Sequence, residues 1–105
     1  MKQAKTSLLP SQERILLALG ENIRLARLRR DLSSAQVAER AGVARTTLVR
    51  LEHGDDGISL ASLLKILFVL GLEADLEAVS RDDAMGRRLQ DLGLLERKRS
   101  SRKRA

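Results

Sequence analysis

Two arginines and two threonines stand among apolar residues between Ala41 and Gly54, in the stretch AGVARTTLVRLEHG. Arginine can donate two hydrogen bonds to O6 and N7 of a guanine, and threonine can bond a base edge or touch the methyl group of a thymine. A helix that holds Arg45, Thr46 and Arg50 outward could therefore read DNA bases. An ordinary exposed helix would suit the same residues, so the elements around them must decide.

Groups that support catalysis are scarce in this chain. His53 is the only histidine and there is no cysteine, which leaves little for a catalytic triad or a zinc site. Neither of the two common glycine-rich phosphate-binding motifs is present. Asp55 and Asp56 stand in a glycine-flanked segment that is typical of a turn. We therefore predict a protein that is not an enzyme and has no cofactor and no metal.

The composition favours helices packed on helices. The 105 residues fit one domain, and 43% of them are hydrophobic, but Phe68 is the only aromatic residue. A core of Leu, Ile, Val and Ala suits an all-α fold better than a sheet. The absence of cysteine fits a reducing compartment, and no apolar run approaches the roughly 18 residues of a membrane span. We expect a cytoplasmic, nucleoid-associated protein.

Charge is distributed unevenly along the chain. The net charge is +6, and six cations with no acid follow Glu96, so the tail supplies the whole excess. Residues 24–50 carry seven arginines against two acids, whereas residues 51–77 carry six acids against one lysine. One face could thus bind a polyanion, although solvated charge with no target fits equally well.

Apolar periodicity and capping residues predict four helices in the first 71 residues. They cover residues 11–30, 34–41, 45–53 and 60–70. Ser33 or Ser34 can cap the second helix, and Gly42 can end it in the left-handed conformation. The fourth helix is apolar nearly all round and should be the buried centre of the domain. The first helix has a second apolar stripe, which would lie either under the N-terminal segment or against a partner, and is formed by Leu17, Leu25 and Leu28.

The second and third helices have the spacing of a helix-turn-helix. Small or apolar residues occupy the expected inward positions, which are Val37, Ala38, Gly42, Val43, Leu48 and Leu51. Ser33, Ser34 and Thr47 are placed to contact the DNA backbone, although Thr47 could pack instead. Glu52 should pair with Arg27 or Arg24.

The segment LSSAQVAERAGVARTTLVRLEHG resembles the helix-turn-helix of the Cro/phage-repressor (XRE) family. With LGENIRLARLRRD before it, the resemblance covers about residues 16–72. It implies a DNA-binding repressor in which Arg45, Thr46 and Arg50 read bases. Two positions depart from the family's pattern. Asp31 stands where glycine is usual, and Ala44 stands where a capping Ser or Thr is common.

Apolar and acidic side chains alternate over residues 72–78, which predicts a half-buried strand over 72–80, although the helix propensity of these residues disagrees. A lone strand needs a partner, so we expect a homodimer in which two such strands pair. The apolar positions of this dimer strand are Leu72, Ala74, Leu76 and Ala78. ISLASLLKILFVLGLEADL with this strand resembles the HipB-like antitoxins, which implies an autorepressor that also restrains a HipA-like kinase toxin. A stand-alone regulator without a toxin partner is the alternative.

The predicted organisation is therefore five helices and one strand. A flexible lead covers residues 1–10, the helix-turn-helix domain 11–71, the dimerising strand 72–80, a short helical extension 81–95 and a basic disordered tail 96–105. The tail would serve as a non-specific DNA arm or only as a solubilising end. Two-fold symmetry predicts a pseudo-palindromic double-stranded DNA operator.

Overall fold

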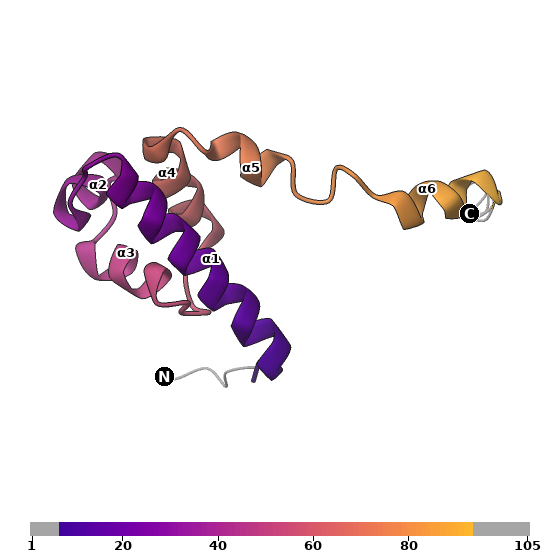
Figure 1. Ribbon diagram of the computed structural model, residues 1–105, viewed down its shortest axis with the longest axis horizontal. Helices are drawn as coiled ribbons and strands as arrows, with labels where there is room; N and C mark the ends of the chain where they lie inside the picture. The colour runs from indigo at the N-terminus through magenta and orange to yellow at the C-terminus, as the bar shows by residue number, and fades with distance from the viewer. Residues whose placement is uncertain (1–6, 94–105) are drawn as a thin grey trace, which may run out of the picture.

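The computed structural model describes residues 7–93, which form six helices and no strand. The helices are α1 (Pro10–Arg29), α2 (Ser34–Ala41), α3 (Arg45–Glu52), α4 (Leu60–Leu70), α5 (Glu73–Glu77) and α6 (Ala84–Asp91). The first five helices pack into one body, and α6 extends away from it (Figure 1). The expected all-α class is confirmed for this part of the chain. Residues 1–6 of the lead and 94–105 of the extension and tail lie outside it.

Local signals in the sequence set the helix ends. The Ser33 hydroxyl accepts a hydrogen bond from the Gln36 N–H at 3.1 Å, so Ser33 rather than Ser34 caps α2. Ser59 caps α4 in the same way. Gly42 and Gly71 end α2 and α4 at φ values of 70° and 75°, which glycine adopts without steric cost.

The hydrophobic core lies where α1, α2, α3 and α4 meet. Its members are aliphatic, as the single aromatic residue required, and comprise Ile23, Ala26, Val37, Ala38, Leu48, Leu51, Ile66, Leu67 and Leu70. Full burial of one such large side chain contributes about 1.5–3 kcal/mol. This core fixes α3, the helix expected to contact DNA bases, against α1 and α2. The orientation of α3 therefore depends on packing.

A buried glycine brings α1 and α3 into backbone contact. A Cβ atom added at Gly20 would lie 2.5 Å from the Leu51 carbonyl oxygen and 2.6 Å from that of Glu52. No side chain larger than hydrogen fits at this point unless the two helices move apart. The close approach explains a glycine in the middle of a 20-residue helix, where it is otherwise unfavourable.

The strand expected over residues 72–80 is wrong, because Glu73–Glu77 forms the helix α5. Leu72 and Leu76 are four residues apart, so one helical face carries both of them onto the core. Ala74 and Ala78 are exposed. Helix propensity and this packing outweigh the alternation, and no other strand exists in the described residues to pair with. The structure thus has six helices instead of five, and the two-stranded dimer contact is lost with the strand.

α4 is not buried all round, contrary to expectation. Leu60, Leu64 and Phe68 follow one side of the helix and are 69%, 46% and 68% exposed. The reason is geometric. The body covers the side of α4 that carries Ile66, Leu67 and Leu70, and nothing in the described residues packs on the other side.

The second apolar stripe of α1 also stays open to solvent. Leu17, Leu25 and Leu28 are 55%, 38% and 47% exposed. None of the helices among residues 7–93 is long and apolar enough to cross a membrane. Leu17, Leu25 and Leu28 form an exposed apolar patch on the surface of the body.

Candidate nucleic-acid interface

α2 and α3 form the two helices of a helix-turn-helix. Gly42 turns the chain, and the Val43 N–H donates a hydrogen bond to the Ala38 carbonyl at 3.1 Å, which closes the turn tightly. Val37 and Ala38 of α2 are buried with Leu48 of α3 in the shared core. This packing presents the opposite side of α3 to solvent (Figure 1).

The outward side of α3 carries side chains that can reach bases. Arg45, Thr46, Val49, Arg50 and His53 are exposed, and Thr47 is half-buried at the edge. Val49 is 37% exposed and has Arg45 and His53 one turn away on either side. An apolar side chain in that place can touch a thymine methyl group.

Arg27 connects the end of α1 to α3 and to the segment that precedes α2. Its Nε and Nη2 donate to the two carboxylate oxygens of Glu52 at 2.7 and 2.9 Å, and its Nη1 donates to the Leu32 carbonyl at 3.0 Å. Glu52 is buried, and the Arg27 side chain is 12% exposed. The hydrogen bonds to Glu52 raise the pKa of Arg27, against the opposing effect of burial. The expected pairing of Glu52 is confirmed, and the partner is Arg27 rather than Arg24, which pairs with Glu21.

Arg50 is held by an acidic residue beyond the end of α3. Its Nε and Nη2 donate to the Asp55 carboxylate at 3.0 and 3.2 Å, and Asp55 Oδ1 also accepts the Gly57 N–H at 2.6 Å. The hydrogen bonds to Asp55 raise the pKa of Arg50. The contact uses one edge of the guanidinium and leaves Nη1 to donate elsewhere. Arg45, Thr46 and Thr47, in contrast, make no side-chain hydrogen bond within residues 7–93.

A comparison with protein-family profiles matches residues 23–76, just over half of the chain, to a helix-turn-helix family of the Cro/C1 (XRE) type. The chain belongs to this family. It is a family of DNA-binding transcription regulators, so this helix-turn-helix protein is a DNA-binding regulator. No curated protein matches the chain in sequence.

Ser33 and Ser34 lie at the N-terminus of α2 in this helix-turn-helix protein. The Ser33 oxygen accepts the Gln36 N–H, but its own hydroxyl proton can still be donated to a phosphate. Ser34 is half-buried. Both residues remain predictions for backbone contact, as do Arg45, Thr46 and Arg50 for base contact.

The two departures from the family pattern have visible structural effects. Asp31 adopts a φ of 56°, the left-handed conformation that a glycine would adopt more easily. Ala44 precedes α3 without a side-chain hydrogen bond to the helix, as its methyl group dictates. Packing and the Arg27–Glu52 pair must therefore stabilise α3.

The contact between Asp55 and Arg50 escaped the sequence analysis. Asp55 was assigned only to a turn, although an acid five residues after Arg50 lies within reach once α3 ends. His53 Nδ1 lies 2.7 Å from the Val49 carbonyl. Because a carbonyl oxygen only accepts, Nδ1 is the donor in this contact. No group of described residues could hold a metal ion.

Proposed function

We propose that the protein is a sequence-specific transcriptional repressor that binds a pseudo-palindromic operator as a homodimer. The observation that carries the proposal is the outward set on α3, which joins two arginines and a threonine to the exposed Val49 on a helix fixed by the core. Arg45, Thr46 and Arg50 read bases, whereas Ser33, Ser34 and Thr47 set the register on the backbone.

Selection of binding sites from random duplex DNA, followed by affinity measurements at fixed salt, tests this proposal. The Arg50→Ala variant should lose roughly tenfold to a hundredfold in affinity for the selected site and accept other bases at one position. Arg29→Ala is the matched control, since Arg29 is an exposed arginine on α1 that should affect both DNA types alike. Equal losses by Arg50→Ala on selected and random DNA would contradict base reading.

The second candidate function is that of an antitoxin that also restrains a HipA-like kinase toxin. The apolar stripe of Leu17, Leu25 and Leu28 supports it, because these side chains stay exposed on the body and could bind a partner protein. The resemblance to HipB-like proteins partly depended on the strand that α5 replaces. Co-expression with a kinase-like product of a neighbouring gene should give a complex that Leu28→Glu weakens. A stand-alone regulator would form no such complex.

A further inference from the structure

Within residues 7–93, α6 makes no extensive contact with another helix. Asp83 caps it by accepting the Gly86 N–H at 3.0 Å, and Arg87 pairs with Asp82 at 2.9 Å. Its apolar residues share one side and are exposed, with fractions of 64%, 39% and 69% for Met85, Leu89 and Leu92. Isolated helices shorter than about 12 residues are marginal in water. An eight-residue amphipathic helix therefore needs a partner surface.

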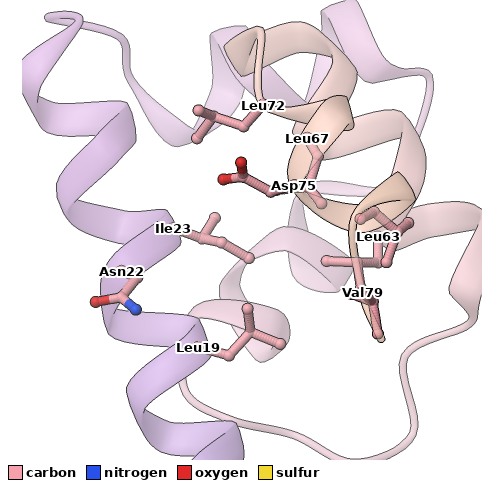
Figure 2. Close-up of a pocket in the computed structure, with 9 residues that line it drawn as sticks. Leu19, Asn22, Ile23, Leu63, Leu67, Leu72, Asp75 and Val79 are labelled. Atoms are coloured by element: carbon pink, nitrogen blue, oxygen red, sulfur yellow. The ribbon is translucent and has the colours of Figure 1, made fainter. Parts of the chain in front are cut away.

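The body offers a matching apolar groove between α1, α4 and α5 (Figure 2). Its volume is about 250 Å³, and its walls include Leu19, Leu63, Leu76 and Val79. A cavity of ~150 Å³ holds a benzene molecule, so this groove has room for aliphatic side chains of the size found on α6. The groove adjoins the exposed side of α4, because Leu63 and Leu64 are neighbours on that helix.

The charges beside the two surfaces are complementary. Asp75 lines the groove, and α5 carries three acidic residues and no cation. On α6, Arg88 directly precedes Leu89 and flanks the apolar side, three residues from Met85. Docking of this side into the groove would bring Arg88 toward the acidic α5.

The groove is poorly placed to receive α6 of its own chain. Val79 is itself part of the groove wall, and only residues 80–83 separate it from α6. Ser80 adopts a left-handed φ of 66°, and the chain then runs away from the body (Figure 1). The Cα radius of gyration of 18.3 Å exceeds the about 13 Å of a compact chain of this length. Four residues span at most about 14 Å, which leaves little chain for a reversal.

We propose that α6 of one copy docks in the α1–α4–α5 groove of a second copy, and the reverse, to form an arm-exchanged dimer. The inference rests on the proposed function only in that a two-fold dimer is the form that a pseudo-palindromic operator requires. Each copy carries both the apolar side of α6 and the groove, so two copies can cover both surfaces at once.

Sedimentation of the full chain without DNA, over a range of concentrations, tests the exchange. The unmodified protein should dimerise, and Leu89→Glu should weaken the dimer at least tenfold. Leu28→Glu is the control, because Leu28 is an exposed leucine on the other side of α1 and should leave the dimer intact. A chain that stays monomeric, or a Leu89→Glu variant that dimerises normally, would overturn the proposal.

Mixing two defective variants distinguishes exchange from any other contact. Val79→Glu places a charge in the groove of a copy, and Leu89→Glu places a charge on the apolar side of its α6. A dimer of either variant alone has no intact α6 facing an intact groove. A mixed dimer retains one such contact, between α6 of the Val79→Glu copy and the groove of the Leu89→Glu copy. The mixture should therefore associate more tightly than either variant alone, and a mixture that does not would refute exchange.

A charge reversal tests whether Arg88 of α6 meets Asp75 of the groove. Asp75→Arg and Arg88→Asp should each weaken the dimer several-fold, and the double variant should recover most of the loss. No recovery would show that these residues do not meet. Binding of random DNA by each variant reports an intact fold, so failure of the exchange stays separate from failure of the Arg50 test.

Discussion

The Arg27 guanidinium donates two hydrogen bonds to the Glu52 carboxylate across the contact between α1 and α3, at 2.7 and 2.9 Å. Removal of one member leaves a buried charge without its partner, which costs about 3–5 kcal/mol. We therefore expect Arg27→Ala to lower the free energy of unfolding by about 3 kcal/mol in urea titrations. Arg24→Ala, which breaks an exposed pair with Glu21, should cost less than about 1 kcal/mol. Similar losses of unfolding free energy in the two variants would contradict a structural role for the Arg27–Glu52 pair.

The same pair has a defined dependence on pH. Folding raises the pKa of Arg27, so its contribution to stability is complete below the pKa of an unfolded arginine and is lost only as the pH rises through the folded value. The difference in unfolding free energy between the unmodified protein and Arg27→Met should thus stay constant from pH 7 to pH 9. A fall in that difference within this range would contradict the assignment.

Asp55 should act on DNA recognition through Arg50. Asp55→Asn removes the charge that fixes the guanidinium but keeps the side chain's shape, so Arg50 becomes free to reach alternative acceptors. We expect the ratio of specific to random DNA affinity to fall several-fold, with little change in stability because the pair is exposed. Asp56→Asn, which removes the neighbouring charge, is the control. An equal effect of both variants would indicate only a change in overall charge.

Gly20→Ala should destabilise the protein although alanine is the better helix former. Propensity alone favours alanine by about 1 kcal/mol. The new Cβ would meet the carbonyl oxygens of Leu51 and Glu52, and such overpacking costs about 1–3 kcal/mol. Thermal unfolding should show a lower midpoint than that of the unmodified protein. A higher midpoint would mean that α1 and α3 separate easily.

A better N-terminal cap on α3 should have the opposite effect. Ala44→Ser supplies the missing acceptor at the N-terminus of α3 and should stabilise the protein by about 1 kcal/mol. Calorimetry should show a midpoint about 4–8 °C higher. Ala61→Ser, at an exposed position inside α4, should give no such gain.

The basic tail should affect how DNA binding depends on salt. Six cations follow Glu96, and each neutralised phosphate steepens the slope of log K against log salt by about 0.9. Deletion of residues 97–105 should flatten that slope and leave the base preference unchanged. Replacement of the six cations by serine should do the same at full length. An unchanged slope would assign the tail to solubility.

The helix-turn-helix was predictable because its signals are local. Ser33 caps the start of α2 and Gly42 ends it, as expected, and the inward residues of α2 and α3 follow from their spacing. The Glu52 pairing with α1 was also anticipated. Whether Arg45, Thr46 and Arg50 contact bases remains a prediction, which only a DNA complex or the variants above can test.

The errors came from features that depend on distant parts of the chain. The alternation of apolar and acidic residues over 72–78 indicated a strand, but Leu72 and Leu76 pack on the core equally well from a helix. The apolar sequence of α4 could not show that one side lacks a covering element. Asp55 reaches Arg50 only because α3 ends between them, and Gly20 matters only because α3 lies across it.

The backbone contact at Gly20 has a kinetic consequence. Because no side chain separates the two backbones at Gly20, we expect α3 to keep one orientation before DNA arrives, so that no slow rearrangement precedes binding. Association should then be limited by diffusion and charge, and be nearly equal for good and poor sites. Operators would be distinguished mainly by how long the protein stays on them.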